Sequence, residues 1–355
     1  MRQPAHGGNL AWAAALAGCP PNAILDFSAS ISPLGPPNSA IAAIKSQIGN
    51  LKHYPDSNYS ELRLALSHFH QLPSEWILPG NGSAELLTLI GRELAQLAAT
   101  ILITPAFGDY YRTLAAYNAK VLECPLSLVS GHWSLFLDKG QRTKDKGLLL
   151  NNPHNPTGKL FSRESILPYL EQFALVVVDE AFMDFVPPNE EESLIPVVQE
   201  YPNLVVLRSL TKFYSLPGLR LGYAIAHPDC LAKWQLWRDP WPVNTLAAAA
   251  AIAALQDTEF QQQTWAWLPP ARNQLFQGLA EIPGLQPQAS AANFLLVESQ
   301  ESTSHLQQQL LKCHQILIRD CLSFKELGDR FFRVAVRQES DNQRLLTALK
   351  ESYKL

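Results

Sequence analysis

Residues 204–223, LVVLRSLTKFYSLPGLRLGY, contain two apolar runs that flank a polar segment with a single lysine. The runs at 204–209 and 221–226 are short and apolar, which is typical of strands buried in a parallel sheet. Lys212 follows the first run, and Arg220 precedes the second. A lysine in apolar surroundings loses its charge easily and can attack a carbonyl to form a Schiff base. Arginine suits a phosphate because it can bind it bidentately. Taken alone, the stretch also fits an ordinary surface lysine after a strand.

The same kind of apolar run recurs along the first two thirds of the chain. Strands are expected at 101–104, 147–152 and 175–180, and helices between the strands at about 83–97, 107–118, 162–172 and 228–238. This alternation predicts an α/β fold with a mostly parallel central sheet and helices on its faces. In such folds, ligands bind beyond the carboxyl ends of the strands.

An acidic pair stands at one of these strand ends. The stretch LVVVDEAFMDF (175–185) runs from a buried strand directly into Asp179. A carboxylate at the edge of the core is expected to face a ligand.

Two loops add groups that could hold the same ligand. GNGSAELL (80–87) places a glycine-rich turn at the start of a helix, where backbone N–H groups and the Ser83 hydroxyl could hold a phosphate. NNPHNPTGK (151–159) would fix Asn155 in a rigid loop with its amide free to donate. Each loop also has a plainer interpretation, as a common turn or as a helix cap.

The four stretches together supply what pyridoxal phosphate requires. They provide a phosphate cradle, a Schiff-base lysine, an acid and an amide at strand ends. The cofactor acts as an electron sink only while its ring nitrogen keeps a proton, and a nearby carboxylate such as Asp179 holds that proton. The joint pattern outweighs the plainer interpretation of each part.

Composition limits the class of protein. The chain has 355 residues, 47% of them hydrophobic and 17% charged, and a formal charge of −4, which suits a soluble enzyme and disfavours nucleic acid as a partner. The longest apolar run, 246–255, is too short to span a membrane. The five scattered cysteines favour reduced thiols in a cytoplasmic protein and show no zinc spacing, so no metal site is expected. The LAGC stretch at 16–19 is interpreted as part of an amphipathic helix, not as a targeting signal.

The chain is expected to divide into three parts. Residues 1–50 would form an N-terminal arm joined to a small domain, 51–240 the large cofactor-binding domain, and 241–355 an interdomain helix and the small C-terminal domain. Within the last part we expect a helical stretch at 243–281 broken by Pro269 and Pro270, strands at 293–298, 316–320 and 331–337, and a helix at 302–314.

The order of these motifs resembles the fold-type I family of pyridoxal-phosphate-dependent aminotransferases. The resemblance lies in the glycine-rich turn, N-P-T-G, D-E-A-F, and Ser209 through Lys212 to Arg220. It implies a homodimer with Lys212 carrying the cofactor, Asp179 at the ring nitrogen and Asn155 at the ring hydroxyl. Phe107 would stack on the ring. The cofactor phosphate would be held by Asn81, Gly82, Ser83, Ser209 and Arg220, and by Tyr54 from the neighbouring subunit.

Within that family the stretches HGGN (6–9), ILDFSASISPLGPP (24–37) and DEAFMDF (179–185) resemble the threonine-phosphate decarboxylases of cobalamin biosynthesis. The expected reaction is decarboxylation of L-threonine O-3-phosphate to (R)-1-amino-2-propanol phosphate. Ser30 and Ser32 stand where that group tends to have asparagine. The resemblance implies Arg333 at the substrate carboxylate and Arg319 at the substrate phosphate, and Ser30 and Ser32 are counted among the substrate residues with them. Arg337 is expected on the same strand face as Arg333. His6 either reaches the substrate phosphate, if the N-terminal arm folds over the site, or belongs to a loose terminus.

Other functions remain to be distinguished. A histidinol-phosphate aminotransferase is the nearest alternative, although that group usually has tyrosine where this chain has Phe182. A non-catalytic sensor or binding protein on the same fold is disfavoured because both Lys212 and Asp179 are present. A dehydrogenase is disfavoured because no G-x-G-x-x-G follows a strand.

Overall fold

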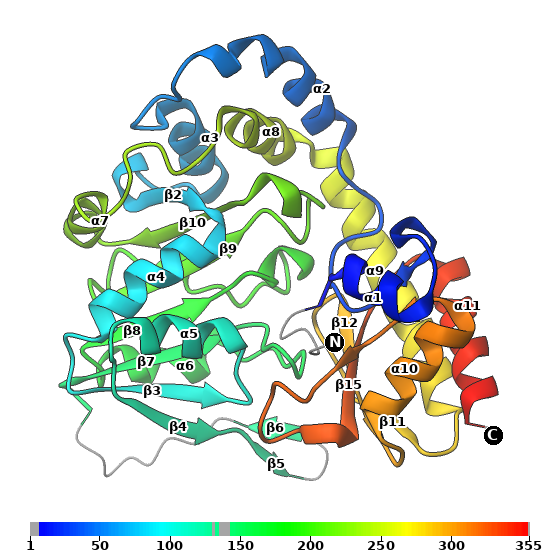
Figure 1. Ribbon diagram of the computed structural model, residues 1–355. Coiled ribbons are helices and arrows are strands. Elements are labelled where there is room, and N and C mark those ends of the chain that lie inside the picture. Colours follow the sequence, from blue (N-terminus) through cyan, green and yellow to red (C-terminus); the bar gives the residue numbers. More distant parts are fainter. Residues whose placement is uncertain (1–6, 130–131, 135–142, 354–355) are drawn as a thin grey trace.

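A computed structural model describes residues 7–129, 132–134 and 143–353. Its largest element is a seven-stranded sheet with strand order β2-β10-β9-β8-β7-β3-β4 (Figure 1). The strands are β2 (Ile77–Asn81), β3 (Ala99–Thr104), β4 (Val121–Pro125), β7 (Lys146–Asn151), β8 (Leu175–Asp179), β9 (Leu204–Ser209) and β10 (Leu221–Ala226). The five strands from β9 to β4 run parallel to one another, as the alternating pattern predicts.

Helices cover both faces of this sheet. One face packs against α4 (Gly82–Leu94), α5 (Gly108–Ala116) and α7 (Pro228–Gln235), and the other against α3 (Ser60–His70), α6 (Arg163–Leu170) and α8 (Thr245–Gln256). Side chains alternate between the two cores, so that Val177 belongs to the first and Val176 to the second. Both are fully buried, and burial of such a side chain contributes about 1.5–3 kcal/mol.

A smaller antiparallel sheet has strand order β11-β12-β15-β14. Its strands are β11 (Leu285–Pro287), β12 (Phe294–Ser299), β14 (Arg319–Asp320) and β15 (Phe331–Ala335), and the helices of this part are α9 (Thr258–Ala280), α10 (Thr303–His314) and α11 (Glu339–Ser352). The N-terminal segment lies here too, because α1 (Leu10–Ala17) contacts α10 and β1 (Leu25–Asp26) pairs with β13 (Ile316–Leu317) (Figure 1).

The remaining elements are short or peripheral. Helix α2 (Asn38–Gln47) contacts α8, and the strands β5 (Ser127–Val129) and β6 (His132–Ser134) pair with each other. The 3-10 helices are η1 (Pro21–Ala23), η2 (Ile48–Lys52), η3 (Ser74–Trp76), η4 (Met183–Phe185), η5 (Ile195–Val197), η6 (Pro217–Leu219) and η7 (Gly328–Arg330). Within the described ranges, no helix combines the length and the apolar character that crossing a membrane requires. None of the five cysteines, all of which lie within the described ranges, is in a disulfide bond.

Two expectations about secondary structure are wrong in the second half of the chain. The helical stretch at 243–281 does not break at Pro269 and Pro270, which lie inside α9. It breaks at Asp257, whose side chain accepts a hydrogen bond from the Phe260 N–H and so caps α9. Buried residues on both sides of the prolines, such as Leu268 and Ala271, hold the helix in place.

The expected strand 316–320 is divided between β13 and β14, which pair in different sheets.

The direction and length of two strands also differ from expectation. Strand β10 runs antiparallel to β9, because the segment between them forms only η6 and holds no crossover helix. Strand β15 ends at Ala335, two residues before Arg337, so Arg337 does not share a strand face with Arg333.

Candidate active site

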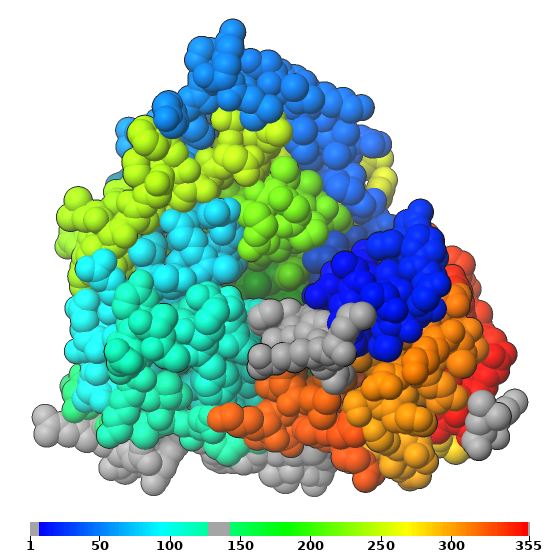
Figure 2. Space-filling view, viewed as in Figure 1, coloured from blue at the N-terminus to red at the C-terminus, as the bar shows by residue number. Residues whose placement is uncertain are grey.

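A cavity of about 400 Å³ lies beyond the carboxyl ends of β8 and β9. It is lined by the large sheet and its helices, by the N-terminal segment around Ser28, and by Arg319, Phe324 and Arg333. Figure 2 shows the face where these parts meet, with the N-terminal segment in blue, α4 and α5 in cyan and blue-green, and the chain near residue 320 in orange.

Most of the predicted site residues line this one cavity: Ser30, Ser83, Phe107, Asn155, Asp179, Ser209, Lys212, Arg220, Arg319 and Arg333. The sequence places them far apart, from residue 30 to residue 333, and the fold brings them together. The cavity lining does not include Ser32, Tyr54, Asn81, Gly82 or Arg337. His6 lies outside the described residues.

Lys212 follows β9 by three residues, and its backbone carbonyl accepts a hydrogen bond from the Ser32 N–H at 3.0 Å. Burial lowers the pKa of its amine to about 8, and the positive charges of Arg333 and Arg220 contribute to the shift, which Asp179 opposes. An amine with this pKa is partly neutral near neutral pH, and the neutral form is the nucleophile that attacks a carbonyl.

Asp179 is the last residue of β8 and is 6% exposed. Its Oδ1 accepts from the Ala181 N–H at 3.0 Å, and its Oδ2 accepts from the Tyr110 hydroxyl at 2.8 Å. Burial raises the pKa of the carboxyl, and these two hydrogen bonds and the charge of Lys212 oppose the rise. Tyr110 was missed by sequence reasoning. The signal that could have found it is its position three residues after Phe107, in the first turn of the helix that the sequence predicts.

The start of α4 lies beside the side chain of Arg220. Gly82 has a φ of +73°, and a Cβ there would lie 2.5 Å from Nη2 of Arg220, so only glycine allows this approach. The cavity also receives the hydroxyls of Ser83, Ser209 and Thr211, of which the last two lie 2.8 Å apart. Backbone N–H groups at a helix start, hydroxyls and a guanidinium are the donors that hold a phosphate monoester.

A second group of donors lies on the side of the smaller sheet. Arg319 of β14 and Arg333 of β15 are paired residues in adjacent strands, and both are buried. Arg333 donates to the Asn155 side-chain oxygen, and burial and the charge of Arg319 lower its pKa to about 10. Two buried like charges side by side are unfavourable, and an anionic ligand would offset that cost.

Ser30 is the other polar group of interest in this region. It is 3% exposed and lines the cavity, and its Oγ has no hydrogen-bond partner among the residues that the structure describes. A buried hydroxyl of this kind is available to a ligand. Ser32 differs, because its Oγ accepts from the Leu34 N–H at 3.4 Å and its carbonyl accepts from the Ser215 hydroxyl.

Two further predicted residues lie away from the cavity. Tyr54 is 79% exposed and stacks on Trp241 with ring centroids 4.5 Å apart, so its contact with a neighbouring subunit stays a prediction. Arg337 forms an ion pair with Asp341 at 2.9 Å and donates to the Asp26 carbonyl at 3.2 Å.

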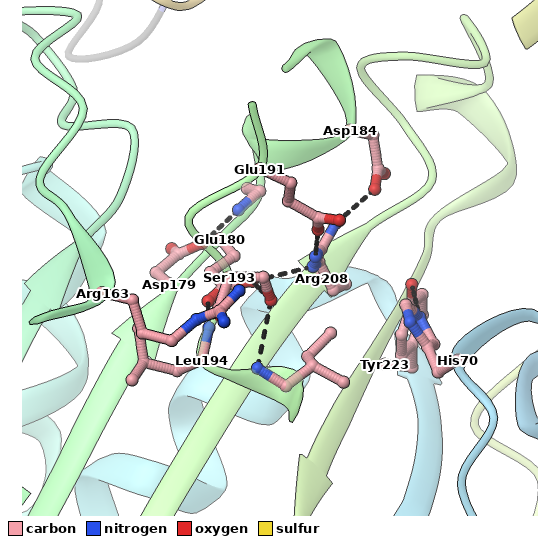
Figure 3. Close-up of polar contacts among 12 residues, drawn as sticks. His70, Arg163, Asp179, Glu180, Asp184, Glu191, Ser193, Leu194, Arg208 and Tyr223 are labelled. Carbon is pink, nitrogen blue, oxygen red and sulfur yellow. Dashed lines mark hydrogen bonds and ion pairs between the residues drawn. The ribbon is translucent and has the colours of Figure 1, made fainter. Parts of the chain in front are cut away.

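A buried charge cluster lies directly behind the site and was also missed (Figure 3). Arg208, 2% exposed, forms ion pairs with Glu180 at 3.0 Å, with Asp184 at 2.5 Å and with Glu191. Glu180 follows Asp179 and Arg208 precedes Ser209, so the cluster connects the ends of the two strands that carry site residues. Burial raises the pKa of Glu180 to about 7 despite the attraction of Arg208.

The described residues contain no group of three or more His, Cys, Asp or Glu side chains placed to bind a metal ion. The cavity instead brings together the buried amine of Lys212, the carboxylate of Asp179, and two groups of donors of the kind that suits anions. Pyridoxal phosphate fits this arrangement, because its phosphate, aldehyde and ring nitrogen require an anion cradle, an amine and a carboxylate.

Comparison with known proteins agrees with a site for pyridoxal phosphate. Residues 22–349 match the model of the aminotransferase class I and II family. A threonine-phosphate decarboxylase of Salmonella typhimurium is 40% identical over 98% of this chain and 96% of its own. An adenosylcobalamin biosynthesis bifunctional protein of Leptospira interrogans is 29% identical over 98% of this chain and 41% of its own. The crystal structure of the histidinol-phosphate aminotransferase from Clostridium acetobutylicum has a TM-score of 0.83 and 28% identity, and covers 93% of this chain and 99% of that one.

Proposed function

Because this chain belongs to the aminotransferase class I and II family, we propose that it is a pyridoxal-phosphate-dependent threonine-phosphate decarboxylase. It converts L-threonine O-3-phosphate to (R)-1-amino-2-propanol phosphate and CO2 and acts in cobalamin biosynthesis, in the cytoplasm. The similarity to the Salmonella enzyme over nearly both full lengths supports this assignment.

The observation that carries the proposal is the presence of two anion-binding groups in one cavity. The cradle of α4, Ser83 and Arg220 suits the cofactor phosphate. Arg319 and Arg333, from the smaller sheet, suit a substrate with two anionic groups. We assign the substrate carboxylate to Arg333 and its phosphate to Arg319, with the free Ser30 hydroxyl as an added donor.

The bound cofactor supplies an electron sink, its protonated ring, for the electron pair left when the bond from Cα to the carboxylate breaks. The residues of the chain prepare that step. With the cofactor bound, Asp179 would hold the proton at the ring nitrogen, Phe107 would cover one face of the ring, and Asn155, whose side-chain oxygen accepts a hydrogen bond from Arg333, would hold the ring hydroxyl. After CO2 leaves, the Lys212 amine or a water returns one proton to Cα.

Product analysis distinguishes this function from that of an aminotransferase. The purified protein with pyridoxal phosphate is incubated with L-threonine O-3-phosphate alone, and separately with histidinol phosphate and 2-oxoglutarate. Stoichiometric CO2 from the first mixture and no glutamate from the second is the expected result. Glutamate without CO2 would show an aminotransferase. Lys212→Ala, the control, is expected to abolish either activity.

The same proposal includes a homodimer in which Tyr54 reaches the cofactor phosphate of the partner subunit. Tyr54 is exposed and stacks on Trp241, which is also exposed, and this exposed aromatic pair supports a contact with a second subunit. Sedimentation of the wild type and of Tyr54→Phe tests the association, and the cofactor affinity of the same variant tests the phosphate contact.

A further inference from the structure

Resting on the proposed use of pyridoxal phosphate, we propose that Tyr110 is a positioning residue that orients the Asp179 carboxylate. In this role Tyr110 keeps the proton that Asp179 shares with the cofactor ring nitrogen on the nitrogen. Tyr110 lies in the first turn of α5, and its role follows from what its hydroxyl and its ring each contact.

The hydroxyl of Tyr110 fixes one of the two carboxylate oxygens. It donates to Oδ2 of Asp179 at 2.8 Å, while the Ala181 N–H donates to Oδ1 at 3.0 Å. Each oxygen therefore has one fixed donor, and rotation of the carboxylate would break both bonds. Tyr110 is 1% exposed and Asp179 6%, so water does not replace either bond readily.

The ring of Tyr110 contacts a second residue of the cofactor site, Phe107. It packs edge-to-face against Phe107, with centroids 5.7 Å apart and an interplanar angle of 87°. Phe107 is the aromatic residue expected to stack on the cofactor ring, and Tyr110 lines the same cavity. One side chain thus contacts both Asp179, which would hold the ring nitrogen, and Phe107, which would stack on the ring.

The hydrogen bond also determines where the shared proton resides. A carboxylate that accepts hydrogen bonds is a weaker base, so it leaves the proton on its partner. Burial alone makes Asp179 a stronger base, since it raises the carboxyl pKa. The Lys212 charge opposes this rise, but that amine is consumed when the cofactor is attached. The bonds from Tyr110 and Ala181 then remain. Burial and Asp179 hold the pKa of the Tyr110 hydroxyl well above its usual value, so it stays a donor.

The test compares Tyr110→Phe with Tyr111→Phe, which removes the neighbouring hydroxyl. Tyr111 bonds Glu123 and lies 5.0 Å from the Lys325 ammonium, away from Asp179. The readout is the magnetic resonance signal of cofactor labelled at its ring nitrogen, together with kcat and KM. In Tyr110→Phe the signal is expected to move toward that of unprotonated pyridine, and kcat to fall roughly tenfold with KM little changed. Tyr111→Phe is expected to match the wild type.

Each outcome bears on one claim. A wild-type protein that takes up no cofactor would contradict the proposed function itself. A wild type that binds and turns over, together with a Tyr110→Phe variant of unchanged nitrogen signal and kcat, would contradict the positioning role alone. Should Tyr110→Phe not fold, fluorotyrosine at position 110 decides. It keeps the shape and strengthens the donor, so the nitrogen signal must move further toward the protonated form, and an unchanged signal would overturn the proposal.

Discussion

Arg333→Gln is expected to slow covalent attachment of the cofactor to Lys212 at neutral pH. Burial is the main reason that the pKa of the Lys212 amine is near 8, and the charge of Arg333 is the next contribution. Replacement of the guanidinium by a neutral amide removes that repulsion. The pKa of the amine should therefore rise toward its ordinary value of 10.5.

The size of the effect follows from the neutral fraction of the amine. With a pKa of about 8, roughly a tenth of the Lys212 amines are neutral at pH 7. With the ordinary pKa, only about 0.03% would be neutral, a difference of roughly 300-fold. Each unit by which Arg333→Gln raises the pKa should lower the rate at pH 7 about tenfold.

The assay mixes apoprotein with pyridoxal phosphate, traps the product with borohydride at timed intervals and quantifies the modified Lys212 peptide across roughly pH 6 to pH 10. Arg337→Gln is the matched control. It removes a nearby arginine that pairs with Asp341 and is not among the charges acting on Lys212. A wild-type midpoint near the pKa of free lysine, or superimposable profiles for wild type and Arg333→Gln, would refute the reasoning.

Three other substitutions test separate features. Gly82→Ala should weaken cofactor binding about tenfold or more, because the new Cβ would meet Arg220 and the φ of residue 82 is positive. Gly218→Ala, where the new Cβ would meet open space, should leave the cofactor affinity unchanged. Equilibrium dialysis measures the affinity of both variants. Glu180→Gln should flatten the pH dependence of the free energy of unfolding. The pKa of Glu180 in the folded protein, about 7, exceeds the ordinary value of 4.5, so the wild type loses stability as the pH rises between these values. Denaturant unfolding at both ends of that pH window measures the loss, and an equal loss in the variant would contradict the prediction. Phe182→Tyr should lower the pKa of the cofactor–lysine linkage, because it adds a hydroxyl at the cavity. A pH titration of the absorption band of that linkage measures the pKa, and an unchanged titration would count against the site.

Much of the large sheet could be predicted from local patterns. The expected strands at 204–209 and 221–226 match β9 and β10, and 175–180 matches β8 to within one residue. Buried strands are continuous apolar runs, so their positions depend on nearby residues alone. The direction of β10 could not be predicted in the same way, because it depends on how the chain between β9 and β10 turns.

Lys212 and Asp179 were recognisable because each stands at the end of a run that must be buried or within three residues of that end. Burial of the run places the next polar residue at the sheet edge whatever the rest of the chain does. The sequence by itself therefore determined that a lysine, an acid and a glycine-rich turn lie at one edge of an α/β sheet.

Only the tertiary structure decided what surrounds them. Tyr110 reaches Asp179 across 69 positions of sequence, and Arg333 reaches Asn155 across 178. No local periodicity carries such contacts, since they depend on how helices pack on a sheet and how the smaller sheet closes against the larger one. The same holds for Arg208 and its carboxylates, whose charges are tolerable in the core only because folding brings them together.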